Sequence, residues 1–241
     1  MSLLEVTDLH IDFATEKGLL HAVRGVDFAL EKGEVLGIVG ESGSGKSVTA
    51  HSTMRLLPKN AQYNGGDVFY QGKSVFDFDY EGLRSFRGRE IGIIFQEPSR
   101  SFDPIYSIGK SMAETIRSHE PELTEEEIYE KSVRLLKETN VPFPEDRLSN
   151  FPHQFSGGLL QRIMIAHALA SDPKVLIADE PTTSLDVTIQ AGIIDLLIRL
   201  KEERNLSIIF ITHNLALISG IADRIVVMYG GLVMEQGPTP E

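Results

Sequence analysis

The 241-residue sequence contains no cysteine. The chain can therefore form neither a disulfide framework nor a thiolate metal site, and it is compatible with a cytosolic compartment. The first residues, MSLLEVTDLHIDF, lack the basic-then-apolar arrangement of a secretory signal. No apolar run approaches the roughly 18 residues that a membrane-spanning helix needs. We therefore expect any membrane association to be peripheral and to depend on another chain.

Basic residues are also few, because 23 Lys and Arg stand against 35 Asp and Glu and give a formal charge of -12. This surplus of negative charge repels phosphate backbones, so we expect no nucleic-acid partner. Any anionic ligand must be held by a local arrangement of donors. Apolar residues make up 41% of the chain and charged residues 24%, as in ordinary folded globular proteins. The length allows one large domain or two small ones.

The pattern of apolar residues predicts an α/β protein that begins with β structure. Polar and apolar residues alternate along 9–13 and 26–30, which is typical of half-buried strands. Short apolar runs predict buried strands at residues 35–39, 91–95, 175–178, 207–211 and 225–228. Helical stretches separate the last three runs, which indicates parallel strands joined by crossovers. Gly230 and Gly231 suit a closing hairpin turn.

Helical patterns replace the strand-like runs between Ile105 and Ala170. The clearest helix is predicted over residues 124–140, where Thr124 and Glu127 have the spacing of a capping box. We interpret this region as a helical insert in the sheet domain.

The segment GESGSGKS at residues 40–47 fits the pattern G-x-x-x-x-G-K-[ST]. In this pattern the backbone N–H groups cradle phosphates, while Lys46 reaches the outer phosphates and Ser47 binds magnesium. The alternative is a flexible glycine-serine turn. The pattern also requires a strand before it and a helix after it, and the sequence predicts both, with the helix running from Lys46 to Pro58.

Two carboxylates, Asp179 and Glu180, follow the apolar run at residues 175–178. Asp179 at the carboxyl end of a strand would lie near a magnesium ion, and Glu180 could orient and deprotonate an attacking water. An acidic pair after a strand is more often a solvated turn. The phosphate loop upstream favours the catalytic interpretation, because it supplies the phosphate on which the pair would act.

Polar side chains also end two further predicted strands. Gln96 follows the run at 91–95, and its amide could contact magnesium or the water. His213 follows the run at 207–212 and could bridge the terminal phosphate and Glu180. Each residue alone is consistent with an ordinary polar side chain whose hydrogen bonds are satisfied. The hypothesis of a catalytic role therefore rests on the combination of these strand ends.

A helical stretch, QRIMIAHALA, follows the segment of Ser156, Gly157 and Gly158. This segment could form a second anion site from the serine hydroxyl, the unblocked backbone and the dipole of the helix. The alternative is a serine N-cap preceded by a glycine-rich turn. The spacing alone does not decide between the two.

Taken in order, these segments resemble the motifs of the ABC ATPase family over nearly the whole chain. The matching segments are GESGSGKS for the Walker A motif, FQEP at 95–98 for the Q-loop, FSGGLLQR at 155–162 for the signature, VLIADE at 175–180 for Walker B, TSLD at 183–186 for the D-loop and His213 for the switch histidine. The wording of VGESGSGKSVTA and ADEPTTSLDVTIQA is most similar to the oligopeptide, dipeptide and nickel importer ATPases of bacteria and archaea.

The resemblance implies one ABC ATPase domain over 1–241. Its catalytic α/β core, with a mostly parallel sheet and an N-terminal antiparallel β subdomain, would comprise 1–104 and 171–241, and its helical subdomain would comprise 105–170. Two such chains, identical or related, would pair head to tail, so that the signature of one covers the ATP of the other. Membrane permease subunits would receive the helical subdomain and the Gln96 segment, and an extracytoplasmic solute-binding protein would act indirectly. The chain would work at the cytoplasmic face of the membrane.

The resemblance also implies a role for each matched position. The catalytic residues would be Lys46, Gln96, Glu180 and His213. Nucleotide would contact Phe13, Gly40, Glu41, Ser42, Gly43, Ser44, Gly45, Lys46, Ser47 and Val48. The partner's ATP would contact Ser156, Gly157, Gly158 and Leu159, the D-loop would include Ser184, Leu185 and Asp186, and Mg²⁺ would be held by Ser47, Gln96 and Asp179. For Phe13, which would stack on adenine, the alternative is a plain core residue of the first strand.

Several positions depart from the family pattern. The signature reads FSGGL where LSGGQ is usual, Asn214 stands where aspartate is common, and Ser184 stands where alanine is frequent. The sequence ends at PTPE, where the peptide-importer branch usually continues, so we expect a shortened or divergent member. The expected function is ATP hydrolysis that powers an importer of peptides. The alternatives are import of nickel or another small solute, an ABC ATPase without a membrane partner, and a nonhydrolysing scaffold.

Overall fold

The computed structural model describes residues 2–183 and 185–239 as two compact units. The first unit comprises the residues up to Phe86 together with those from Asn205 on, and the second unit comprises Arg87–Arg204. This division does not test the predicted subdomain boundaries after residues 104 and 170, which stay a prediction. No helix in the described part of the chain is long and apolar enough to cross a membrane.

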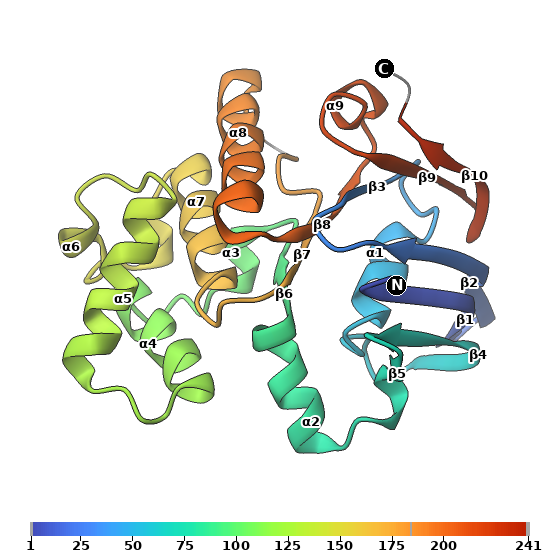
Figure 1. Ribbon diagram of the computed structural model, residues 1–241, viewed down its shortest axis with the longest axis horizontal. Coiled ribbons are helices and arrows are strands. Elements are labelled where there is room, and N and C mark those ends of the chain that lie inside the picture. The colour runs from blue at the N-terminus through green and yellow to red at the C-terminus, as the bar shows by residue number, and fades with distance from the viewer. Residues whose placement is uncertain (1, 184, 240–241) are drawn as a thin grey trace. The chain divides into compact units, whose positions relative to one another are not determined.

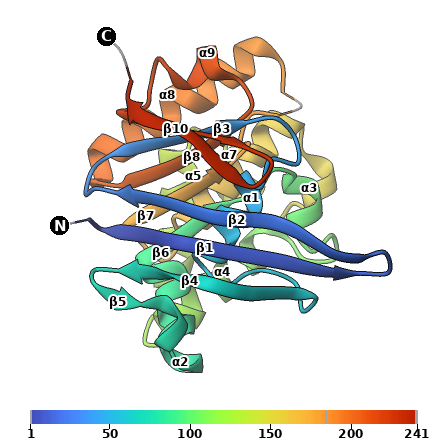
Figure 2. The ribbon, with the colours of Figure 1, turned by 90° about the vertical axis from the view of Figure 1, so that its right-hand side faces the viewer.

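The first unit contains two sheets. Its elements are β1 (Leu4–Thr15), β2 (Gly18–Leu30), β3 (Val35–Gly40), α1 (Lys46–Ser52), β4 (Ala61–Tyr70), β5 (Lys73–Ser74), η1 (Val75–Asp77), α2 (Tyr80–Ser85), β8 (Ser207–Thr212), α9 (Leu215–Ile218), β9 (Arg224–Tyr229) and β10 (Leu232–Pro238). An antiparallel sheet has the order β2-β1-β4-β5, and Figure 2 shows its three long strands side by side. In the other sheet β3 pairs in parallel with β8 and β9, and β10 closes an antiparallel hairpin with β9.

The turn between β9 and β10 forms at the two predicted glycines. Gly230 and Gly231 have φ values of 55° and 81°, in the left-handed region that glycine adopts without strain. The N–H of Gly231 donates to the carbonyl of Ser44, and the N–H of Arg24 donates to the carbonyl of Gly231. The hairpin therefore supports the loop that follows β3.

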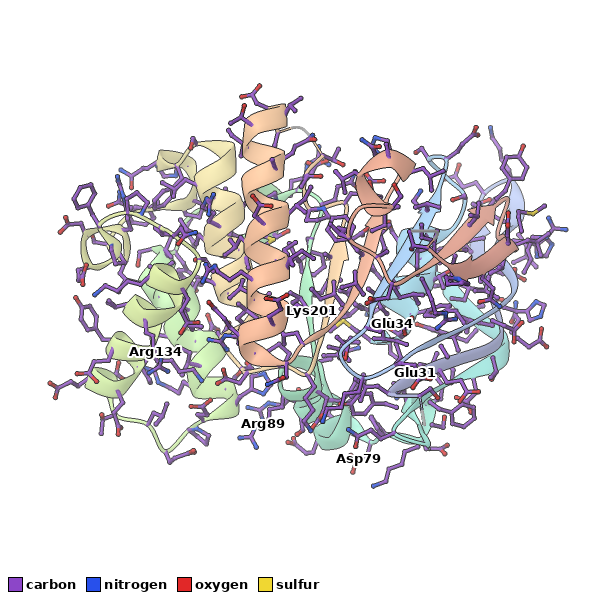
Figure 3. The ribbon with its side chains drawn as sticks, turned by 45° about the horizontal axis from the view of Figure 1, so that its top comes forward. Glu31, Glu34, Asp79, Arg89, Arg134 and Lys201 are labelled. Atoms are coloured by element: carbon purple, nitrogen blue, oxygen red, sulfur yellow. The ribbon has the colours of Figure 1, made fainter. Side chains whose placement is uncertain are left out.

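The turn between β2 and β3 is tied by acidic side chains. Glu34, which is 7% exposed, accepts from the backbone N–H of Glu31 and pairs with Arg224 at 3.1 Å. Figure 3 shows Glu31 and Glu34 close together. A buried carboxylate needs such partners, because burial of an unpaired charge is costly.

Two predictions for the first unit were wrong in detail. The helix α1 ends at Ser52 rather than Pro58, because the hydroxyls of Ser52 and Thr53 bond back to helix carbonyls and Arg55 turns to φ 52°. Asp12 was expected on the polar face of its strand, yet it is only 8% exposed. A register shift between Ile11 and Asp12 displaces the alternation, and the carboxylate accepts hydrogen bonds from His21 and Asn64.

The second unit is mostly helical, with one pair of parallel strands. Its elements are β6 (Ile91–Ile94), α3 (Pro98–Ser101), α4 (Ile108–His119), α5 (Glu125–Glu138), α6 (Pro144–Arg147), η3 (Pro152–Gln154), α7 (Gly157–Ala168), β7 (Val175–Asp179) and α8 (Val187–Arg204), while η2 (Phe86–Glu90) runs across the boundary from the first unit. Helices α4, α5 and α7 pack against one another (Figure 1). The predicted helical region is confirmed between β6 and β7, and α5 begins with the predicted capping box of Thr124 and Glu127.

Packing in the second unit follows helical periodicity. Along α8 the buried residues Ile193, Leu196, Leu197 and Leu200 recur every three or four positions. At Gly92 of β6 an added Cβ would lie 2.8 Å from the carbonyl oxygen of Ala168, at the end of α7. Glycine therefore allows this strand and helix to approach closely.

Candidate active site

The loop after β3 is folded around the side chain of Lys46. Lys46 is 4% exposed, and its Nζ donates to the carbonyls of Gly40 at 2.9 Å and Glu41 at 2.8 Å. At Gly40 an added Cβ would lie 2.2 Å from the carbonyl oxygen of Met228, so only glycine fits. Gly45 has φ 97° and directly precedes α1. The ammonium group is thus held within the loop that the sequence assigns to phosphate.

The remaining loop residues differ in exposure. Glu41, Ser42 and Gly43 are exposed, Ser47 and Val48 are half-buried, and Ser44 is buried. The hydroxyl oxygen of Ser44 lies buried with no hydrogen-bond partner. A buried polar atom without a partner is unusual, and a bound anion would give it one.

Phe13 lies on β1, opposite Leu20 of β2 and Ala61 of β4. Its ring is half-buried rather than enclosed in the core. The first unit therefore leaves part of this ring accessible for stacking. Its predicted contact with adenine stays a prediction.

Glu180 of the second unit is held by two side chains. Gln96 Nε2 donates to Glu180 Oε2 at 2.9 Å, and the hydroxyl of Thr183 donates to the same oxygen at 2.8 Å. The parallel pairing of β6 and β7, with Ile94 opposite Ala178, brings the two strand ends to one edge. The structure therefore brings Gln96 and Glu180 together, as the strand ends suggested.

The backbone at the end of β7 turns sharply. Asp179 is the last residue of the strand and is 3% exposed. Glu180 has φ 47°, an uncommon value for a side-chain-bearing residue, and its carbonyl accepts from the N–H of Thr183 at 3.1 Å. This turn puts the Thr183 hydroxyl within reach of the Glu180 carboxylate. Sequence reasoning assigned Thr183 only to the D-loop and missed this contact, although the i, i+3 spacing was visible.

Helix α7 begins directly after Ser156. Ser156 occupies the N-cap position, but its hydroxyl makes no capping hydrogen bond and the residue is exposed. This observation favours the anion-site interpretation over a plain serine cap. Gly157 is exposed, whereas at Gly158 an added Cβ would lie 2.7 Å from Ile189 Cγ2. Leu159 is half-buried.

The other predicted residues are placed as follows. Leu185 is half-buried, Asp186 is exposed, and Ser184 lies outside the described residues. In the first unit, His213 is exposed and directly follows β8. The side chain of Asn214 accepts from Leu217 N and caps α9, so this departure from the family pattern has a structural role.

The proposed magnesium ligands are a hydroxyl, an amide oxygen and a carboxylate. Ser47 belongs to the first unit, and Gln96 and Asp179 belong to the second. Hard oxygen donors of this kind suit Mg²⁺, which keeps several waters and takes few ligands from the protein when phosphates bind it. Within residues 2–183 and 185–239, no group of three or more histidine, aspartate or glutamate side chains could hold a metal ion. The three donor types therefore suit a magnesium ion that phosphate also binds.

A family model and two curated relatives that match this chain all describe transporter proteins. The model of the family described as ABC transporter matches residues 23–183. The chain is 48% identical over 240 residues to the oligopeptide transport ATP-binding protein OppD of Bacillus subtilis, covering 99% of this chain and 67% of that protein. It is 45% identical over 238 residues to the dipeptide transport ATP-binding protein DppD of Lactococcus lactis, covering 99% and 68%. The chain thus spans about two thirds of the length of these relatives.

Solved structures of similar fold are ABC cassettes. The dimeric post-hydrolysis state of MJ0796 bound to ADP and phosphate superposes with a TM-score of 0.86 at 26% identity, covering 99% of each chain. CbiO1 of Clostridium perfringens, part of the transporter complex cbiONQ, superposes with a TM-score of 0.82 at 29% identity, covering 99% of this chain and 89% of that one. The family match over residues 23–183 and the near-full-length identity to OppD show that this chain belongs to the ABC transporter family, as one of its ATP-binding subunits.

Proposed function

We propose that this chain binds ATP with magnesium and hydrolyses it to ADP and phosphate, and that this cycle drives peptide import. The main support for this proposal is that Gln96 and Thr183 both donate hydrogen bonds to the Glu180 carboxylate at the end of β7. A carboxylate fixed in this way is placed to orient an attacking water and accept its proton. The names of the 45–48% identical relatives support peptides as the cargo.

In the proposed reaction Lys46 and the loop N–H groups bind the phosphates. Lys46 leaves the carbonyls of Gly40 and Glu41 and donates to the outer phosphate oxygens, where it stabilises the negative charge that the transition state develops. Ser47, Gln96 and Asp179 would hold a magnesium ion, which supplies charge neutralisation at the phosphates when bound. Glu180 takes the proton of the water, and His213 stabilises the terminal phosphate.

We further propose that two cassettes act as a head-to-tail pair. Ser156 and Gly157 are exposed, and the Ser156 hydroxyl makes no capping bond, so both groups are available to a nucleotide held by a partner subunit. ATP binding then closes the pair and hydrolysis reopens it, because the nucleotide contacts Ser156 and Gly157 of the opposite subunit only in the closed state. Permease subunits in the membrane would use this motion for alternating access, with the chain at their cytoplasmic face.

Phosphate release by the complex that copurifies with the chain tests this function. We expect release that requires magnesium, rises when a peptide-loaded binding protein is added, and is lost in a complex carrying Lys46→Ala. A matched complex carrying the exposed-site variant Lys32→Ala should keep the wild-type rate. A wild-type complex that binds ATP without releasing phosphate would refute the ATPase, and stimulation by nickel but not by peptide would refute the cargo.

A further inference from the structure

The side-chain amide of Gln161 lies buried in α7 without a hydrogen-bond partner. Gln161 is 2% exposed, and its Nε2 has neither a solvent contact nor an acceptor. An unpaired buried amide N–H₂ costs free energy, because it has given up its bonds to water. A leucine or methionine would fill the same volume without that cost. The glutamine is therefore poorly suited to a purely structural role in this state.

Gln161 lines a cavity of about 340 Å³ within the second unit. The same cavity is lined by Gln96 and Thr183, the two residues that donate to the Glu180 carboxylate. Gln161 thus belongs to the wall of the space that also contains both partners of the candidate base, while its Nε2 is buried within that wall. None of these contacts depends on the first unit.

The amide of Gln96 offers the acceptor that Gln161 lacks. Gln96 Nε2 donates to Glu180, and no hydrogen bond to its Oε1 is present in the described structure. A donor placed at Oε1 would fix which end of this amide faces Glu180. It would also polarise the amide and strengthen the donation from Nε2, since linked hydrogen bonds reinforce one another.

We propose that Gln161 is a positioning residue for Gln96. During the catalytic cycle the Gln96 segment closes onto α7, and Gln161 Nε2 donates to one lone pair of Gln96 Oε1, which leaves the other lone pair for magnesium, while Gln96 Nε2 keeps its bond to Glu180. These two linked hydrogen bonds connect the first turns of α7 to the candidate base, Glu180. The inference rests on the proposed ATPase, because its effect appears in turnover.

Phosphate release by the copurified complex tests the role of Gln161 through three readouts. Gln161→Met should lower kcat on the order of tenfold, the effect of about one neutral hydrogen bond, and leave the KM for ATP unchanged. Gln161→Glu should be inactive at high pH and recover as pH falls, because only a protonated carboxyl group can donate to Gln96 Oε1. In a double-mutant cycle, Gln161→Met should add little to Gln96→Leu but should add fully to Thr183→Val.

Unfolding of the purified chain gives a readout that needs no activity. Gln161→Met should leave stability unchanged or raise it, since no bond is lost in the resting chain. The matched variant is Gln190→Met, whose amide donates to the carbonyls of Thr182 and Leu185 at 3.0 Å each and whose loss should destabilise the fold. Equal destabilisation by the two variants would overturn the proposal, because the Gln161 amide would then already be paired, for example by a buried water.

The kinetic outcomes separate this inference from the proposed function. A Gln161→Met complex with wild-type kcat, or a cycle in which Gln161 couples to Thr183 and not to Gln96, would overturn the positioning role alone. A wild-type complex that releases no phosphate would instead refute the ATPase. In that case the stability comparison still tests whether the buried amide is unpartnered.

Discussion

Gln96 Nε2 lies 2.9 Å from Glu180 Oε2, although 84 positions separate the two residues in the sequence. The contact arises because β6 and β7 run parallel and end at the same edge. The backbone of Glu180 is left-handed, and the Thr183 hydroxyl donates to the same carboxylate oxygen. The orientation of Glu180 therefore depends on two neighbours that can be removed one at a time.

Replacing Gln96 by leucine should lower kcat of the transport complex by roughly ten- to a hundredfold, since Glu180 would lose the hydrogen bond from Gln96 and would no longer be fixed toward the water. The measurement is steady-state phosphate release at saturating ATP. The exposed glutamine of β10 provides the control, and Gln236→Leu should not change the rate. A Gln96→Leu complex with normal turnover would show that this amide does not orient the base.

The two glycines that open α7 should respond differently to an added methyl group. Among the described residues, a Cβ at Gly157 would meet only Leu185, at 3.5 Å, whereas a Cβ at Gly158 would lie 2.7 Å from Ile189 Cγ2. We expect Gly158→Ala to lower the free energy of unfolding by about 1–3 kcal/mol through overpacking, and Gly157→Ala to change it by less than about 1 kcal/mol.

Chemical denaturation of both variants checks this prediction. Adding Ile189→Ala to Gly158→Ala should recover part of the loss, because it removes the clashing Cγ2 atom. Equal stability of the two glycine variants would contradict the close approach of α7 and α8. Phosphate release should fall in the Gly157→Ala variant although that variant is folded. The reason is that its added methyl group lies where we propose that the partner's nucleotide binds.

Much of the fold could be predicted from the sequence because it follows local patterns. The buried strands, the Thr124 capping box and the Gly230–Gly231 turn all depend on residues that are near one another in the chain. The helix α1 was predicted six residues too long, since its end depends on hydroxyls that bond back to the helix and not on the nearest proline. The burial of Asp12 depends on a bulge whose register is set by neighbouring strands.

The candidate site was predictable as residue types at strand ends but not as contacts. Parallel strands bring Gln96 and Glu180 to one edge, and the sequence shows this directly. The Thr183 bond needs a left-handed φ at Glu180, which no propensity predicts for a glutamate. The missing partner of Gln161 was equally invisible, because it depends on how α7 packs.

Lys131 of α5 should be important for the stability of the second unit. It is 6% exposed, and its Nζ pairs with Glu120 and Asp172 at 2.7 Å each, while Arg204 also pairs with Asp172 at 2.7 Å. Lys131→Met should lower the free energy of unfolding by about 2 kcal/mol, less than for a fully buried pair because both carboxylates keep solvent contact. Urea unfolding measures the change. Lys32→Met, at an exposed position, is the control. If both variants changed the free energy of unfolding by the same small amount, the ion pairs of Lys131 would have no structural role.

His167 of α7 should make stability depend on pH below neutrality. Burial lowers the pKa of this imidazole from 6.5 to about 4, and its Nε2 lies 2.9 Å from the Thr115 hydroxyl. The unfolded chain therefore binds a proton between pH 6.5 and 4 that the folded chain does not bind. Stability is full above pH 6.5 and is lost as pH falls toward 4, by at most about 3 kcal/mol, since the residue as a whole is half-buried.

Comparison of wild type with His167→Gln isolates this effect, because all other groups titrate alike in the two proteins. The stability difference between them should shift in favour of the glutamine variant as pH falls from 6.5 to 4, and stay constant above 7. A difference that does not change with pH would mean that His167 titrates normally in the folded chain.

The central claim is that the loop at Lys46 holds ATP while Glu180 activates water. The most direct measurement determines the nucleotide bound to a Glu180→Gln complex after incubation with MgATP, together with its phosphate release. The account predicts that ATP stays bound and intact at an affinity close to that of wild type, in a closed pair, with phosphate release at least about a hundredfold slower. Bound ADP with a wild-type rate of release would contradict it.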